Sequence, residues 1–150
     1  GVKWPNDVLV DGRKISGILA EVLPGEDGDV ILGAGVNTTM AEVDLPVATA
    51  TSFTALGASA DEDRLLADFL SGLRDHIAHL AVSGADDALR ERVAAACVTI
   101  GEDVVVSLPG GETLTGTAER LDEDGRLVVR TGSVESVVGA GDVVHVRGAG

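Results

Sequence analysis

The organisation of this chain follows from its first nineteen residues, Gly1-Val-Lys-Trp-Pro-Asn-Asp-Val-Leu-Val-Asp-Gly-Arg-Lys-Ile-Ser-Gly-Ile-Leu19. An Asp-Gly pair between alternating apolar runs is a strong hairpin signal, because glycine supplies the positive φ that a tight turn needs. The pattern therefore predicts two strands, Asp7–Val10 and Lys14–Val22, joined by a turn at Asp11 and Gly12.

Polar side chains gather at the two ends of this predicted hairpin. Lys3, Trp4, Asn6 and Asp7 stand at or before the first strand, and Arg13 and Lys14 open the second. A surface hairpin does not need an indole, an amide, a carboxylate and an ammonium gathered so closely. We interpret the cluster as a candidate site for an anionic ligand.

Composition narrows the class of protein. A length of 150 residues suits one ordinary domain, or a small domain and a piece of another. Shares of 45% hydrophobic and 24% charged residues are typical of a globular protein, and only 2% are aromatic. The net charge of -14 would be repelled by nucleic-acid phosphates and anionic lipid surfaces. We therefore expect neither nucleic acid nor a membrane among its partners.

The single cysteine, Cys97, cannot form an internal disulfide, and the sequence shows no signal peptide or long apolar span. We expect a cytoplasmic protein. Because its neighbours in sequence are apolar, Cys97 is predicted to be a small buried hydrophobic residue rather than a catalytic thiol.

A third strand is predicted at Val30–Val36, after a turn at residues 23–29. This strand is apolar on both faces, which favours a central place in a sheet. Gly33 and Gly35 suggest a close approach by backbone or ligand. They do not make a dinucleotide fingerprint, because a third glycine and a following helix are lacking.

Two helices are expected after a loop around Pro46 that includes a short helix at Ser52–Leu56. Ser59 is predicted to cap the first helix in a capping box with Glu62, and Gly84 to end it. Its apolar face consists of Leu65, Leu66, Phe69, Leu70, Leu73, Ile77 and Leu80. The second helix is predicted at Asp86–Ala96. His76 and His79 have a spacing that could hold a metal, but surface histidines are the favoured interpretation.

From about Thr99 the pattern takes the period of strands. Five short strands are predicted, at Asp103–Leu108, Thr113–Leu121, Arg126–Arg130, Ser133–Val138 and Val143–Val146. Strands of this length and spacing favour a small SH3-like barrel. Such a barrel says little about function by itself.

Four blocks of sequence together resemble a biotin–protein ligase. They are Lys3-Trp4-Pro5-Asn6-Asp7, Arg13-Lys14, Gly17-Ile18-Leu19 with Glu21, and Gly33-Ala34-Gly35-Val36-Asn37, in the family's order and spacing. The resemblance implies an α+β fold, in which residues 1–97 are part of a mixed-sheet ligase catalytic core with helices. Residues 98–150 would then be the small SH3-like β-barrel that such ligases carry.

The resemblance also implies an activity. Such ligases form biotinyl-5′-AMP from biotin and ATP, with Mg²⁺, and pass the biotin to a lysine of a biotin carboxyl carrier protein domain; they often form homodimers. Lys14 corresponds to the catalytic lysine, and Asp7 to an indirect partner of Mg²⁺. The residues implied to bind ATP or biotinyl-adenylate are Lys3, Trp4, Asn6, Asp7, Arg13, Gly17, Ile18, Leu19 and Asn37.

Each of these residues also has a plain structural interpretation. Lys14 suits the solvated end of a strand, and Asn6 and Asp7 suit a turn in which they bond local backbone. Trp4 suits a core, and a buried Asn37 needs hydrogen-bond partners in any fold. Two other functions stay open: a lipoate- or octanoyl-transferring relative, and a non-catalytic module that binds a carrier domain.

The family's Arg- and Gly-rich loop, which closes over biotin and the phosphates, has no counterpart in residues 1–150. Much of the biotin pocket is also built upstream of the matching blocks. We therefore expect residues 1–150 alone to be weak or inactive as a ligase.

Overall fold

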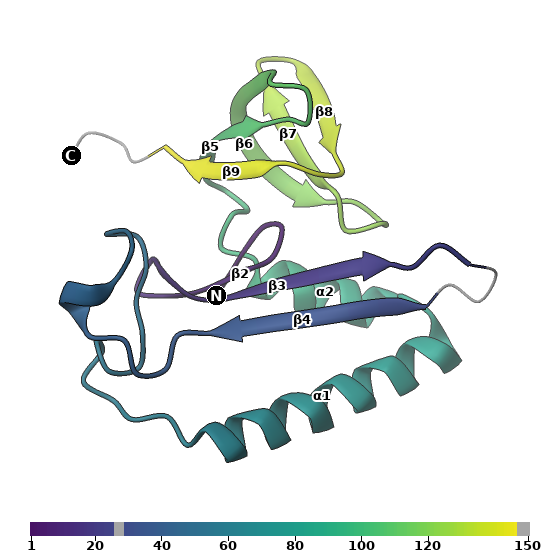
Figure 1. The fold of residues 1–150 in the computed structure, drawn as a ribbon. Coiled ribbons are helices and arrows are strands. Elements are labelled where there is room, and N and C mark those ends of the chain that lie inside the picture. The colour runs from purple at the N-terminus through teal and green to yellow at the C-terminus, as the bar shows by residue number, and fades with distance from the viewer. Residues whose placement is uncertain (26–28, 147–150) are drawn as a thin grey trace. The chain divides into compact units, whose positions relative to one another are not determined.

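The computed structural model describes residues 1–25 and 29–146, which form two compact units (Figure 1). Unit 1 combines Gly1–Pro5 with Asp87–Gly150, and unit 2 is Asn6–Asp86. Residues 26–28, in the predicted turn after Leu23, lie outside the described residues. These units are groups of residues in mutual contact and do not test domain boundaries. The division into domains at 1–97 and 98–150 therefore stays a prediction.

Unit 2 contains the predicted hairpin. Strand β2 (Asp7–Val10) pairs antiparallel with β3 (Arg13–Val22), and β3 pairs antiparallel with β4 (Val30–Val36). The turn has φ values of 49° at Asp11 and 73° at Gly12. Two consecutive positive φ angles are the geometry of the tight turn that an Asp-Gly pair favours. The predicted hairpin is therefore confirmed.

The predicted central position of β4 was wrong for the described residues, where β4 lies at the edge of its sheet. All 7 of its residues are exposed, including Val30 and Ile31, each more than half exposed. Apolar residues on both faces indicate that the faces are fit for burial. The side chains do not indicate whether a strand has a hydrogen-bonded neighbour on one edge or on both. The apolar composition of β4 therefore did not predict its place in the sheet.

Helix α1 (Glu62–Ser83) ends at Gly84, as predicted, with φ 66°. The predicted cap at Ser59 was wrong: Asp61 directly precedes the helix, and its carboxylate accepts a hydrogen bond from the Arg64 amide at 3.0 Å. No residue of α1 is buried in the part of the chain that the structure describes, and its predicted apolar face is exposed there except at Leu65 and Leu73, which are half-buried.

Shorter elements complete the helical part. A 3-10 helix, η1, spans Glu42–Asp44, and a hydrogen-bonded turn at residues 53–57 replaces the predicted short helix. Helix α2 spans Asp87–Ala96, within a residue of its prediction. Among the described residues, no helix is long and apolar enough to cross a membrane.

Unit 1 contains a five-stranded antiparallel sheet in the order β8-β7-β6-β5-β9. Its strands are β5 (Asp103–Ser107), β6 (Thr113–Leu121), β7 (Leu127–Thr131), β8 (Val134–Val138) and β9 (Asp142–His145). All five predicted strands are present within one residue at each end, and the α+β class is confirmed. The sequence analysis missed the short strand β1 (Val2–Lys3), which forms a parallel bridge between Val2 and Cys97.

The core of unit 1 joins both ends of the chain. Its buried residues are Trp4, Cys97, Val104, Val106, Ala118, Leu127, Val129, Val138 and Val143. Valine dominates because few aromatic residues are available to fill the space. Cys97 is 7% exposed, which confirms the prediction that it is a buried apolar residue.

Candidate functional site

A β-bulge decides which way Lys14 points. In a regular strand, Lys14 and Gly17 would face opposite sides, because they are separated by an odd number of positions. Here Asp7 pairs with Gly17 but Leu9 pairs with Lys14, so Ile15 is an extra residue in β3. The bulge therefore brings Lys14 onto the face shared by Asp7 and Gly17.

Lys14 and Asp7 form an ion pair on this face. The Lys14 Nζ lies 2.6 Å from the Asp7 Oδ1. The lysine side chain is 47% exposed and the aspartate side chain only 16%. The more buried carboxylate therefore anchors an ammonium group that an anion in solution can still reach.

Gly17 provides the space in which this pair forms. A Cβ atom at position 17 would lie 3.1 Å from both Cε and Nζ of Lys14, and 3.6 Å from Asp7 Oδ1. Contacts of 3.1 Å are tighter than nine in ten real Cβ contacts, so the end of the lysine side chain passes over a gap that glycine leaves open. Lys14, Asp7 and Gly17 thus form one local arrangement.

The backbone of Lys14 is fixed by a loop segment. The Lys14 amide donates to Thr49 O and the Lys14 carbonyl accepts from the Thr51 amide, both at 2.8 Å. Asn37 holds this segment through two hydrogen bonds. Its side-chain Nδ2 donates to Thr51 O at 2.9 Å, and its backbone amide donates to Ile15 O at 2.8 Å. Asn37 is therefore brought to the same part of unit 2 as Lys14, as a structural connection between β4 and the loop.

Asn6 connects the beginning of β2 to β3. Its Nδ2 donates to Ile18 O at 2.6 Å, and its carbonyl accepts from the Ile18 amide at 2.9 Å. Arg13 pairs with Glu42 at 2.6 Å on the exposed surface. Leu19 is 58% exposed on β3.

Lys3 and Trp4 belong to unit 1 and are described within it. Trp4 is 6% exposed, and its Nε1 donates to Gly125 O at 3.1 Å. The Trp4 amide donates to the buried hydroxyl of Thr99 at 2.9 Å, and the same hydroxyl lies 3.2 Å from His145 Nε2. Burial lowers the pKa of His145 below its ordinary value, the nearby charges of Glu102 and Lys3 acting in opposite directions.

Sequence reasoning missed Ile15, Thr49, Thr51 and Thr99. Thr51 is fully buried, and its hydroxyl has no hydrogen-bond partner among the described residues. The loop that contains Thr49 and Thr51 has no periodicity, and no residue type in it signals a strand-like pairing with Lys14. A β-bulge likewise has no short-range signal here, since Ile15 suits a regular strand.

The histidine pair of α1 is exposed, as predicted for surface residues. His76 Nδ1 lies 2.6 Å from Gly72 O, and His79 Nε2 lies 3.0 Å from Asp86 Oδ2. Across residues 1–25 and 29–146, no three His, Cys, Asp or Glu side chains are grouped in a way that could hold a metal ion.

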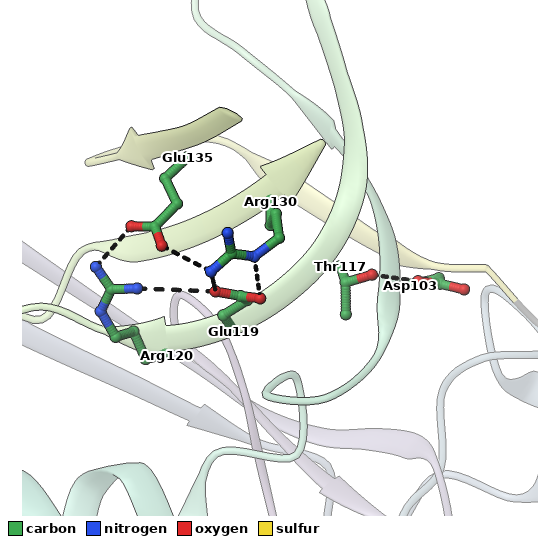
Figure 2. A network of polar contacts seen from close by, with 6 residues as sticks. All are labelled: Asp103, Thr117, Glu119, Arg120, Arg130 and Glu135. Carbon is green, nitrogen blue, oxygen red and sulfur yellow. Dashed lines mark hydrogen bonds and ion pairs between the residues drawn. The ribbon is translucent and has the colours of Figure 1, made fainter. Parts of the chain in front are cut away.

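A second group of charges lies on the sheet of unit 1. Arg130 contacts Glu119 and Glu135, and Arg120 contacts the same two carboxylates, so that two cations alternate with two anions (Figure 2). Glu119 is an extra residue in β6, since Ala118 pairs with Val129 but Arg120 with Val128. The hydrogen bond from Arg130 lowers the pKa of Glu119, and the one from Arg120 lowers the pKa of Glu135. The two arginines and two glutamates of the network balance one another in charge.

Two family models match separate parts of the chain. Residues 99–146 match the biotin protein ligase C terminal domain, and residues 1–37 match the biotin/lipoate A/B protein ligase family. The two matches fall where the sequence resemblance placed the barrel and the ligase blocks.

Curated relatives include a biotin–[acetyl-CoA-carboxylase] ligase of Mycobacterium tuberculosis, which is 43% identical over 150 residues. That match covers 98% of this chain and 53% of the relative, so the chain spans about half of the relative's length. The bifunctional ligase/repressor BirA of Escherichia coli is 41% identical over 66 residues, which cover 42% of this chain and 20% of the relative.

Solved structures share the fold. A biotin protein ligase from Aquifex aeolicus matches with a TM-score of 0.83 and 22% identity, over 97% of this chain and 64% of that chain. The same ligase in complex with biotin and ATP matches with a TM-score of 0.77 and 22% identity, over 98% of this chain and 62% of that chain.

Proposed function

This chain belongs to the biotin protein ligases, and we propose that it serves the ATP-dependent attachment of biotin to a carrier protein. In the first step, the biotin carboxylate attacks the α-phosphate of ATP, which forms biotinyl-5′-AMP and releases pyrophosphate. In the second, the amine of a carrier lysine attacks the acyl carbon, which forms an amide and releases AMP. ATP and biotin are the ligands in the solved complex of the Aquifex aeolicus biotin protein ligase.

One observation carries this proposal: the ammonium group of Lys14 is held on an accessible face by Asp7, over the gap at Gly17. Both steps change the negative charge around the α-phosphate and the acyl-phosphate linkage. A positioned cation stabilises that charge more than a mobile one, because it needs no reorganisation when the charge develops. We therefore assign Lys14 as the catalytic residue of this chain.

The remaining predicted residues are proposed to bind the adenylate or ATP. Gly17, Ile18 and Leu19 present a strand segment with little side-chain bulk at its beginning, which suits close approach of a flat ligand. Arg13 precedes Lys14 in β3 and pairs with Glu42, and its guanidinium is proposed to bind phosphate oxygens of the ligand. Asn6 and Asn37 already hold backbone groups through their amides, so their proposed contribution is to fix the shape of this segment.

Lys3 and Trp4 belong to unit 1, and their roles are proposed separately. The buried position of Trp4 supports an indirect role at the nucleotide, in which the ring fixes the backbone that carries Lys3. The Lys3 ammonium is proposed to contact ATP phosphates.

Magnesium, where it is required, would be held mainly by the nucleotide phosphates and water. Mg²⁺ is commonly bound by one or two carboxylates and substrate phosphates rather than by a cage of protein groups. Asp7, whose carboxylate also pairs with Lys14, is proposed to make such an indirect contact. The magnesium ion would neutralise negative charge on the leaving pyrophosphate.

The acceptor is proposed to be a biotin carboxyl carrier protein domain, and ATP as a substrate supports a cytoplasmic location. Homodimer formation also stays a proposal. Biotin is preferred to lipoate because residues 99–146 match a domain family described for biotin protein ligases, whereas residues 1–37 match a family shared with lipoate enzymes.

The test is thermal unfolding of the chain with and without biotinyl-adenylate. A ligand present at about 100 times its Kd should stabilise the native state by about 2.7 kcal/mol. We expect this gain to disappear in Lys14→Ala and to remain in Arg74→Ala, which removes an exposed cation from α1. A chimaera in which residues 1–150 replace the matching part of the Mycobacterium tuberculosis ligase tests catalysis. An inactive chimaera together with no ligand-dependent stabilisation would contradict the proposal.

A further inference from the structure

Asp7 forms an ion pair with Lys14, which a contact with magnesium would not require. Its Oδ1 is 2.6 Å from the lysine Nζ, and its side chain is the more buried member of the pair. Because the lysine end of the pair is 47% exposed, water and salt screen the attraction, and such pairs add little to stability. The pair is therefore poorly explained as a device that stabilises the fold.

The local backbone is built to make this pair possible. The bulge at Ile15 turns Lys14 to the Asp7 face, and the missing Cβ of Gly17 leaves room for the lysine to cross. Hydrogen bonds to Thr49 and Thr51 hold the Lys14 backbone on its other edge. Three separate features thus converge on the placement of one ammonium group.

We propose that Asp7 is a positioning residue for Lys14, and that Gly17 is the gap that lets the two meet. The inference rests on the proposed function, in which Lys14 acts on the acyl-phosphate. A free lysine side chain has many rotamers, and ordering it opposes ligand binding and catalysis. Asp7 restricts Lys14 before the ligand arrives, so less ordering remains for the reaction. Because lysine has three N–H donors, the ammonium can contact Asp7 and a ligand oxygen together.

The chain suits a direct measurement of this restriction. Lys3 and Lys14 are the only lysines in the sequence, so a sample labelled with ¹³C at lysine Cε gives one probe of each. We expect Asp7→Asn to lower the order parameter of the Lys14 Cε group markedly, because the ion pair that holds this group is lost. Gly17→Ala should lower it less, because the flexible end of the lysine needs to move only a few tenths of an ångström.

Matched controls are available in the same sheet. Asp11→Asn removes a carboxylate from the tip of the same hairpin, at a position whose φ of 49° asparagine tolerates. Gly35→Ala is the same change at the residue of β4 that pairs with Gly17. An added Cβ at position 35 meets no atom within 4 Å. Neither control should change the Lys14 signal. Equal mobility of Lys14 in the native chain and in Asp7→Asn would overturn the inference.

Catalysis in the chimaera gives the second readout. We expect Asp7→Asn to lower kcat about 10-fold or more with a smaller change in KM for biotin, because misplacement affects the transition state most. A changed requirement for Mg²⁺ with an unchanged Lys14 signal would assign Asp7 to the metal alone and overturn the positioning role. The NMR result does not depend on ligase activity, so failure of the proposed function would be seen separately as a chimaera without activity.

Discussion

The hydroxyl group of Thr99 accepts a hydrogen bond from the Trp4 amide at 2.9 Å and lies 3.2 Å from His145 Nε2. One fully buried side chain therefore connects residues near both ends of the chain within unit 1. Because Trp4 follows Lys3 directly, the stability of the C-terminal sheet and the placement of a proposed ATP-binding lysine depend on the same contacts.

Thr99→Val should destabilise unit 1 by about 1–3 kcal/mol, the cost of leaving a buried polar group without its partner. Valine has the shape of threonine but cannot accept the Trp4 N–H. Unfolding in urea measures the change. The control is Thr113→Val, at an exposed position at the beginning of β6, and an equal loss in the control would contradict the role of the buried hydroxyl.

Trp4→Ala should cost about 3–5 kcal/mol, the usual effect of removing a large aromatic side chain from a core. The Trp4 ring is 6% exposed and packs in the valine-rich core of unit 1. Denaturant unfolding followed by circular dichroism measures the loss. Val134→Ala is the control, since Val134 is 61% exposed and should change stability by less than about 0.5 kcal/mol.

His145 should make the chain less stable in mild acid. Burial lowers its pKa below the ordinary value of 6.5, so the unfolded state binds a proton more readily than the folded state. Stability contributed by neutral His145 is therefore present above pH 6.5 and is lost as the pH falls below it. Melting temperatures between pH 7.5 and pH 5 should show a smaller decline in His145→Gln than in the native chain. An unchanged decline would exclude His145 as its cause, and the exposed His76→Gln serves as the control.

The charge network of β6, β7 and β8 should fail at lower pH. Hydrogen bonds from Arg130 and Arg120 lower the pKa values of Glu119 and Glu135 below 4.5. Their contribution is present above that value and is lost as the pH falls through the folded-state pKa values. Glu135→Gln should make the acid unfolding curve less steep below pH 4.5, and added salt should have less effect on this variant. Glu112→Gln, in the exposed loop before β6, should change neither the acid unfolding curve nor the effect of salt on it.

Local patterns in the sequence predicted most of the elements but not the key contacts. The Asp11-Gly12 turn and the alternating strands of unit 1 are short-range signals, and the structure has them where they were expected. The pair of Lys14 and Asp7 was not predictable, because regular alternation places Lys14 on the wrong face of β3. Only the bulge at Ile15 reverses this, and it depends on pairing with β2 and on the loop at Thr49. The core position of Trp4 likewise depends on residues more than a hundred positions away.

The discontinuity of unit 1 bears on how the protein is made. During synthesis Trp4 leaves the ribosome before any strand of the C-terminal sheet, yet it shares a core with Val143 of β9. Asn6–Asp86 can form its own contacts in the meantime, whereas Trp4 stays without its core partners until the strands up to β9 have been translated. Contacts between residues so distant in sequence form slowly. The segment that contains Lys3 is therefore expected to reach its native position after Asn6–Asp86 has formed its own contacts.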